Sequence, residues 1–176
     1  MNRAVFLDRD GVINRVVLRN GLPHPPPSAD EISFFPGVGE AIDRLRRADF
    51  RIIVATNQPD VANKLQQREE VEAIHQRIRQ AFQVDDVRVC YHSDADGCRC
   101  RKPKAGMLLE AAEEWFLDLK QSFMVGDRWR DIGAGKAAGC RTVLVGGGYG
   151  EPQPDKPDAV VDSLLEASAL IISNKV

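Results

Sequence analysis

The sequence predicts an α/β protein with a Rossmann-like, mostly parallel sheet, helices on both faces, and a minimal cap domain or none. Short apolar runs alternate with longer segments whose apolar residues recur at helical spacing, as in proteins built from repeated strand–helix units. The first apolar run has no polar alternation, which is typical of a strand buried on both faces. Several runs end in polar side chains of complementary types. Because parallel sheets carry their sites at the carboxyl ends of strands, these observations also predict where the site lies.

The size and composition suit one domain spanning residues 1–176, large enough to bury a core. Hydrophobic residues make up 43% and charged residues 28% of the chain, and the formal net charge of −2 offers no overall attraction to nucleic acid or an anionic membrane. No run approaches the roughly 18 apolar residues of a membrane span, and no secretion signal is recognisable. We therefore expect a cytoplasmic protein without nucleic-acid or membrane partners, and we expect a monomer.

The first strand is the apolar run at residues 4–7, and it stops at Asp8-Arg9-Asp10-Gly11. In an extended backbone, side chains two residues apart point the same way, so the carboxylates of Asp8 and Asp10 would lie side by side. Two buried acids repel each other unless a cation offsets their charge, so the pair indicates a metal-assisted site. The alternative is a turn after the strand, because Asp and Gly are common turn residues.

The remaining elements follow in alternation along the chain. Helices are expected at residues 38–45, 68–82, 107–115, 131–138 and 164–172, and strands at residues 50–55, 87–91, 123–125, 142–145 and 159–161. Pro36-Gly37 opens the first helix, and Gly139 is a plausible C-cap of the fourth. Residues 146–148 and 151–157 are expected to form a flexible loop punctuated by proline.

A proline-rich stretch at residues 19–28 interrupts the alternation. Its three consecutive prolines, at 25–27, exclude a helix and a central strand, so we expect a loop near the mouth of the site that contacts substrate. We expect His24 in this loop and His75 on a charged helix face to be exposed or in a loop rather than catalytic. Cys140 and Trp115 are expected in the core.

The polar residues at the strand ends match what phosphoryl transfer needs: a nucleophile, a metal site, fixed donors and an acid. Asp8 and Asp10 follow the first strand. Thr56 follows the strand at residues 50–55, Lys102 follows the loop after the strand at residues 87–91, and Asp127 follows the strand at residues 123–125. Taken singly, Thr56 is also readable as a strand-end hydroxyl and Lys102 as a solvated charge. Their agreement at several strand ends favours an active site.

The set Asp8-x-Asp10-Gly11, Thr56, Lys102 and Gly126-Asp127, with Asp131 four residues on, resembles the four motifs of the haloacid dehalogenase superfamily of phosphatases. The resemblance spans nearly the whole chain. It implies that Asp8 is the nucleophile that forms an aspartyl-phosphate. It implies that Asp10 protonates the leaving oxygen and then activates water.

The same resemblance implies the ligands of a Mg²⁺ ion and of the phosphoryl group. The carboxylates of Asp8 and Asp127 and the backbone carbonyl of Asp10 would hold Mg²⁺, which prefers oxygen ligands. Thr56 and Lys102 would hold the transferring phosphoryl group. Asp131 would act through water or orient Lys102, although an acid early in a helix is also favoured by the helix dipole.

A second group of residues, Cys90-x-His92 and Cys98-x-Cys100, predicts a zinc site. Three thiolates and one imidazole complete a tetrahedral shell without an open position, so the zinc would be structural. In a reducing compartment such a cluster indicates metal rather than disulfides. The alternative is a set of buried thiols with a polar histidine. Zinc would fix the loop that leads to Arg101 and Lys102.

The Cys-x-His, Cys-x-Cys and Arg-Lys-Pro pattern is similar to that of the small capless phosphatases that remove the 7-phosphate of D-glycero-D-manno-heptose 1,7-bisphosphate. This resemblance implies a sugar bisphosphate as substrate, with Arg101 and Arg128 binding the distal phosphate. Arg128 is also readable as a surface charge. Asn57 and Gln58, which follow Thr56, are expected to contact substrate.

The chain departs from that family where substrate would be read. Residues 59–64 replace an Ala-Arg-Gly segment, and the proline-rich stretch is longer than expected. Two alternatives therefore stay open: a phosphatase of histidinol phosphate or another small phosphomonoester, and a zinc-dependent binding module without turnover. The intact pair of Asp8 and Asp10 argues against the binding module.

Overall fold

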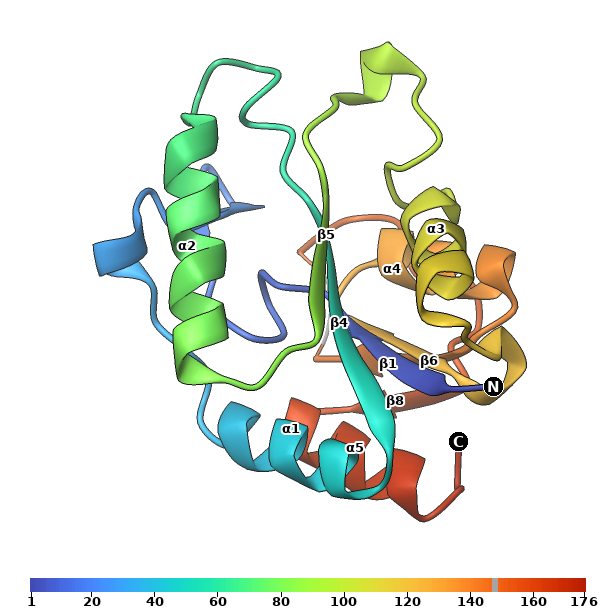
Figure 1. The fold of residues 1–176 in the computed structure, drawn as a ribbon. Helices are drawn as coiled ribbons and strands as arrows, with labels where there is room; N and C mark the ends of the chain where they lie inside the picture. Colours follow the sequence, from blue (N-terminus) through green and yellow to red (C-terminus); the bar gives the residue numbers. More distant parts are fainter. Residues whose placement is uncertain (147–148) are drawn as a thin grey trace.

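The computed structural model describes residues 1–146 and 149–176, and its main sheet is six-stranded and entirely parallel. The strands of this sheet are β1 (Arg3–Leu7), β4 (Phe50–Asn57), β5 (Asp86–Cys90), β6 (Phe123–Gly126), β7 (Arg141–Val145) and β8 (Ala159–Val161). Their order across the sheet is β5-β4-β1-β6-β7-β8 (Figure 1). The predicted parallel α/β fold is confirmed.

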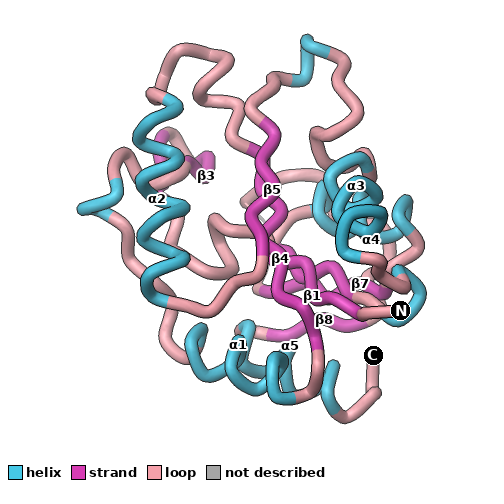
Figure 2. The backbone as a smooth tube through the Cα atoms, viewed as in Figure 1, coloured by secondary structure: helices cyan, strands magenta, loops and turns pink. Residues whose placement is uncertain are grey.

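Helices cover both faces of the sheet (Figure 2). The helices are α1 (Val38–Arg47), α2 (Arg68–Ala81), α3 (Gly106–Trp115), α4 (Trp129–Ala138) and α5 (Leu164–Ile172). Val5 and Leu7 of β1 belong to a core with α1, α2 and α5, whereas Ala4 and Phe6 belong to a core with α3. This alternation follows from the two-residue period of a strand, so an unbroken apolar run supplies both cores. Cys140 and Trp115 lie in or against the second core, as predicted.

The sheet has a switch point at β1. The chain leaves β1 for β4 and β5 on one side, then returns to pair β6 with the other side of β1. Loops after β1 and β6 therefore diverge and leave a crevice at the carboxyl ends of these strands. Asp8 directly follows β1, and Asp127 directly follows β6.

The predicted elements differ from the structure mainly at their ends. Helix α4 begins two residues before the predicted start, because the Asp131 carboxylate accepts a hydrogen bond from the Arg128 backbone N–H and caps the first turn. Short 3₁₀ helices that were not predicted are η1 (Ala29–Glu31), η2 (Asp94–Asp96) and η3 (Leu119–Gln121). Of the predicted flexible loop, residues 147 and 148 lie outside the described residues.

The proline-rich stretch contains an antiparallel hairpin where only a loop was expected. Its strands are β2 (Val17–Arg19) and β3 (Leu22–His24). Both are edge strands, where a proline such as Pro23 is tolerated, and the three consecutive prolines follow the hairpin. Among the described residues, no helix is long and apolar enough to cross a membrane.

Candidate active site

The turn after β1 brings Asp8 onto the end of β6. The Asp8 backbone N–H donates to the Val125 carbonyl at 2.9 Å. Gly11 has φ +92°, and a Cβ at this position would lie 1.8 Å from Oδ2 of Asp127. Only glycine fits such a backbone so close to a carboxylate. Gly11 therefore allows Asp8, after β1, and Asp127, after β6, to lie close together.

Three buried carboxylates form an acidic cluster of Asp8, Asp127 and Asp131, in which one oxygen of each lies within 4.8 Å of the others. Burial raises the pKa of Asp8 to about 6. Burial and the neighbouring Asp8 raise the pKa of Asp127 well above its usual value. Oδ2 of Asp127 accepts from the Tyr149 hydroxyl at 2.8 Å, while the buried Oδ1 has no hydrogen-bond partner among the residues that the structure describes. A buried oxygen of this kind, on one of three clustered carboxylates, fits a divalent cation with oxygen ligands.

Lys102 neutralises part of this cluster from the other side. Its Nζ lies 2.9 Å from Oδ1 of Asp8 and 2.5 Å from Oδ1 of Asp131, and it donates to the Ala55 carbonyl at 2.7 Å. Burial alone would lower the pKa of Lys102, but the two carboxylates outweigh that effect and raise it. The lysine therefore stays charged beside the predicted nucleophile.

The Asp10 carboxylate is not part of the acidic cluster and is held by three donors. Nδ2 of Asn14 donates to Oδ1 at 2.9 Å, and Nε2 of Gln58 donates to Oδ2 at 2.8 Å. The Arg9 guanidinium contacts both oxygens, with its Nη2 2.9 Å from Oδ2. Asp8 and Asp10 nevertheless line the same cavity. Asp10 thus lies in the cavity but outside the acidic cluster, and its predicted role in proton transfer remains a prediction.

The residues at the end of β4 connect the site to its loops. Thr56 and Gln58 are each 1% exposed, and Nε2 of Gln58 donates to the Thr56 hydroxyl oxygen at 2.8 Å. Asn57 lines the cavity and makes two hydrogen bonds to the Lys102 backbone, at 3.0 and 3.1 Å. The substrate contacts predicted for these three residues remain predictions.

The cavity has a volume of about 270 Å³, and three arginines lie in one wall, which we call the basic wall. Arg101 and Arg128 lie in this wall together with Arg130, which sequence reasoning missed, and the contact of Arg101 and Arg128 with a distal phosphate remains a prediction. Arg101 Nε and Arg130 Nη1 both lie 2.9 Å from Oδ1 of Asp94, and the Arg101 side chain lowers the pKa of Asp94 to about 2. Arg128 donates to Glu151 through its Nε at 2.7 Å. Arg130 and Asp94 are 36 residues apart, so no local pattern could have paired them.

The proline-rich stretch borders the cavity, as predicted. Pro23, His24 and Pro25 line it, and Nδ1 of His24 lies 3.2 Å from Oδ2 of Asp60. Asp60 belongs to the segment that departs from the family pattern. The two unusual segments thus meet at one side of the cavity.

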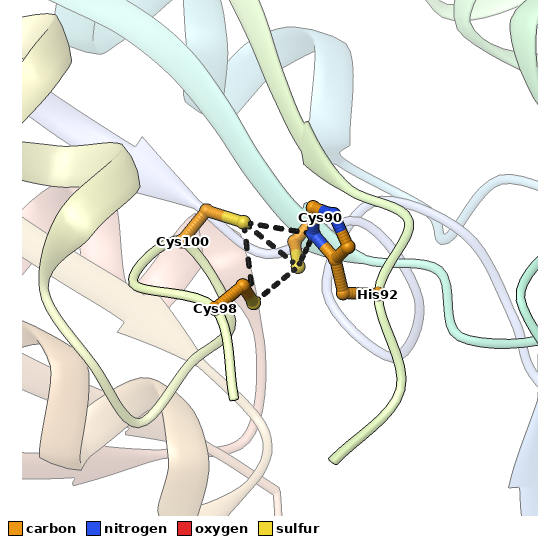
Figure 3. A group of neighbouring side chains, drawn as sticks. All are labelled: Cys90, His92, Cys98 and Cys100. Carbon is orange, nitrogen blue, oxygen red and sulfur yellow. Dashed lines mark hydrogen bonds between the residues drawn. The ribbon is translucent and has the colours of Figure 1, made fainter. Parts of the chain in front are cut away.

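The cysteines and histidine of the predicted zinc site converge beyond the end of β5, with their side chains directed at one another (Figure 3). The three sulfur–sulfur distances run from 3.1 to 3.7 Å, and Nδ1 of His92 lies 3.6 Å from Sγ of Cys90 and 3.3 Å from Sγ of Cys100. All are far longer than a disulfide bond of about 2.05 Å. Zinc bonds of about 2.3 Å to sulfur and about 2.0–2.1 Å to nitrogen place tetrahedral ligands roughly 3.5–3.8 Å apart. The four side chains therefore fit a zinc ion.

His75 corrects one expectation from the sequence, because it is 3% exposed and not on a solvated face. Its Nε2 lies 3.2 Å from Nη1 of Arg9, a residue 66 positions away whose side chain is fully buried. Helical periodicity identifies a face but not a distant polar partner, so the charged neighbours of His75 were misleading. Burial, helped by Arg9, lowers the pKa of His75 to about 4, so the ring is neutral at neutral pH.

The fold and the site together place the chain in the class of α/β phosphatases. A family model described as HAD-hydrolase-like matches residues 99–167. The D-glycero-beta-D-manno-heptose-1,7-bisphosphate 7-phosphatase of Pseudomonas aeruginosa is 37% identical over 182 aligned residues, which cover 97% of this chain and 99% of that protein. The protein of the same name from Haemophilus influenzae is 32% identical and covers 95% of this chain and 93% of its own length.

Solved structures agree with these relatives. The D,D-heptose 1,7-bisphosphate phosphatase of Bordetella bronchiseptica, complexed with magnesium and phosphate, superposes with a TM-score of 0.83 at 33% identity, covering 98% of this chain and 99% of that one. A putative HAD-like phosphatase from Mesorhizobium loti gives 0.77 at 30% identity, covering 98% and 87%. The chain therefore belongs to the HAD-like phosphatases, in the family of the heptose-bisphosphate phosphatases.

Proposed function

We propose that this chain removes the 7-phosphate of D-glycero-β-D-manno-heptose 1,7-bisphosphate in a Mg²⁺-dependent reaction through an aspartyl-phosphate on Asp8. The observation that carries the proposal is one cavity that joins the acidic cluster and Lys102 to the basic wall of Arg101, Arg128 and Arg130. A monophosphate engages only the first part, whereas a bisphosphate engages both. The names of the relatives supply the sugar and the β anomer.

In the first half-reaction a carboxylate oxygen of Asp8 attacks the phosphorus, and the bond from phosphorus to the sugar oxygen breaks. Asp10, protonated at this stage, gives its proton to the departing sugar oxygen. Lys102, already 2.9 Å from Asp8, and the Thr56 hydroxyl offset the charge on the phosphoryl oxygens. The products of this step are the free sugar hydroxyl and phosphorylated Asp8.

In the second half-reaction water attacks the phosphorus of the aspartyl-phosphate. Asp10, now ionised, takes one proton from that water, and the bond from phosphorus to the Asp8 oxygen breaks. Inorganic phosphate leaves, Asp8 is restored as a carboxylate, and Asp10 is again protonated. One carboxyl group thus serves as acid and then as base, because the two steps are opposite in their need for a proton.

The residues that would hold Mg²⁺ are Asp8, Asp127 and the backbone of Asp10, with Asp131 beside them. The unpaired Oδ1 of Asp127 supports this assignment, as does the magnesium and phosphate in the Bordetella bronchiseptica structure. When bound, Mg²⁺ would neutralise the carboxylates and the phosphoryl oxygens. Without a cation, the approach of a phosphate dianion to Asp8 would meet repulsion from all three acids of the cluster.

We also propose that Cys90, His92, Cys98 and Cys100 hold a structural zinc ion. The four ligand atoms are at distances that suit a closed tetrahedral shell, which leaves no position for a substrate or water. Arg101 and Lys102 directly follow the last ligand, so the ion would fix the backbone that carries them.

The test is phosphate release from both anomers of the heptose bisphosphate and from histidinol phosphate, with Mg²⁺ present. We expect the β anomer to be preferred by at least about 100-fold, which corresponds to about 2.7 kcal/mol of transition-state discrimination. Similar slow rates on all three esters would refute the heptose substrate and favour another small phosphomonoester. No phosphate release from any ester would favour the binding module.

A further inference from the structure

The most completely buried charged side chain of the site belongs to a residue outside the proposed chemistry, Arg9, which is 0% exposed. We propose that His75 is a positioning residue that orients the Arg9 guanidinium and, through it, the acid and base Asp10. The chain of contacts runs from Asp10 through Arg9 and His75 to the surface of α2.

The geometry of Arg9 supports the first link. Its Nε lies 3.1 Å and its Nη2 2.9 Å from Oδ2 of Asp10, and Nη2 also lies 3.2 Å from Oδ1. Its Nη1 faces away from Asp10, toward Nε2 of His75 at 3.2 Å. The guanidinium is therefore held at both ends, by a carboxylate on one side and an imidazole on the other.

Hydrogen-bond chemistry fixes the direction of the second link. Arginine only donates, so Nε2 of His75 must accept, and the ring proton must lie on Nδ1. Nδ1 lies 3.5 Å from Oε2 of Glu72, and Oε1 of the same residue accepts a hydrogen bond from the Tyr91 hydroxyl. Glu72 is about half exposed, and it therefore links this buried arrangement to the surface. In the tautomer with its proton on Nδ1, His75 accepts from Arg9 through Nε2 and directs its N–H toward the Glu72 carboxylate, so both ring nitrogens have a suitable partner.

Loss of the imidazole would leave a buried guanidinium nitrogen without an acceptor, which is costly. The guanidinium would turn toward another partner and carry Asp10 with it, because these two groups share a bidentate contact. General acid catalysis needs the acid within hydrogen-bond reach of the leaving oxygen, so a displacement of about 1 Å would slow proton transfer. Asn14 and Gln58 hold Asp10 from other directions, so the effect should be partial.

The inference rests on the role of Asp10 in the proposed function, and leaving-group dependence tests it. An alkyl phosphate such as the heptose bisphosphate needs a proton on its leaving oxygen, whereas 4-nitrophenyl phosphate does not. We would measure leaving-group release in a single turnover with each ester, since later turnovers also include hydrolysis of the aspartyl-phosphate. His75→Asn and His75→Gln form the matched pair, because only the longer amide reaches the position of Nε2.

For His75→Asn we expect the single-turnover rate to fall about 10-fold or more on the alkyl ester and less than about 3-fold on 4-nitrophenyl phosphate. His75→Gln should restore most of the alkyl rate, and Asp10→Asn should show the same selectivity with a larger loss. Equal losses on both esters, or no loss on either, would overturn the inference. Should His75→Asn fail to fold, Glu72→Gln takes its place: a loss larger on the alkyl ester than on 4-nitrophenyl phosphate supports the inference, and equal losses on both esters, or none, overturn it.

This design separates the inference from the proposed function. If the wild-type chain releases no phosphate from any ester, the proposed function fails. If the wild type and Asp10→Asn behave as expected but the His75 variants leave the ratio of the two rates unchanged, only the role of His75 is refuted.

Discussion

Asp8 shows how one residue balances reactivity against stability. Its carboxylate lies in a cluster of like charges that burial has removed from water, and Lys102 is the counter-charge at 2.9 Å. Burial and the neighbouring acids thus destabilise the charged form of Asp8, and Lys102 stabilises it. Such strain is expected at a site whose ligand, a cation, supplies the missing charge.

We expect Asp8→Asn to lower turnover by at least about 1,000-fold, because the amide is nearly isosteric but a poor nucleophile. The melting temperature without Mg²⁺ should stay equal or rise, since the change removes repulsion while Lys102 keeps its contact with Asp131. Steady-state phosphate release and thermal melts would check both. Substantial residual turnover would remove Asp8 from its proposed role.

Single residues also mark the limit of prediction from sequence. Asp8 and Asp127 were predictable because each directly follows an apolar run at a strand end, a local signal that a parallel sheet converts into proximity. Lys102 lies in the loop after β5, and its place in the site was predicted from the family resemblance rather than from an apolar run. His75 and Arg130 were not predictable, because their partners, Arg9 and Asp94, come from distant parts of the chain. The contacts predicted for Thr56 and Gln58 with substrate stay predictions.

Among the elements, the strands and helices were predictable in order and approximate extent because their apolar periodicity is strong. The hairpin of β2 and β3 was not, because two short strands around Asn20-Gly21 carry little periodicity and one contains Pro23. The early start of α4 also escaped prediction, since it depends on a cap from Asp131 rather than on apolar residues.

The loop after β5 should depend on zinc. Removal of zinc by a chelator, followed by return of excess Mg²⁺, should lower both the melting temperature and turnover, because the metal fixes the backbone before Arg101 and Lys102. Zinc content measured by elemental analysis should track the lost activity, and returned zinc should restore it. Full activity and an unchanged melting temperature in zinc-free protein would refute the structural role.

The start of α4 should determine the preference for a second phosphate. Arg128→Ala should lower kcat/KM for the bisphosphate about 10- to 150-fold, the value of roughly 1.5–3 kcal/mol for a hydrogen bond to a charged group. For a matched monophosphate the change should be below about 3-fold. Lys120→Ala, in η3 before the amino end of β6, is a control for loss of one positive charge. Equal losses on both substrates would exclude Arg128 from the distal phosphate site.

For the whole molecule, the acidic cluster should couple cation binding to stability. Mg²⁺ at about 100 times its dissociation constant should stabilise the fold by about 2.7 kcal/mol, a rise of roughly 5–10 °C in melting temperature for a domain of this size. Asp127→Asn should reduce this shift, because it removes one negative charge from the acidic cluster. An identical shift in wild type and variant would place the cation elsewhere.

The ion pairs in the basic wall determine which anions the cavity excludes. Arg101 and Arg130 both pair with Asp94, and Arg128 pairs with Glu151. The three positive charges are therefore largely neutralised by carboxylates of the protein itself. An incoming anion gains little from charge alone and must displace a resident carboxylate to be held. The ion pairs therefore set a minimum interaction energy that an anion must supply in order to bind. Chloride and other weak monoanions of the cell supply less than this energy, while a phosphate dianion with several acceptor oxygens can supply more.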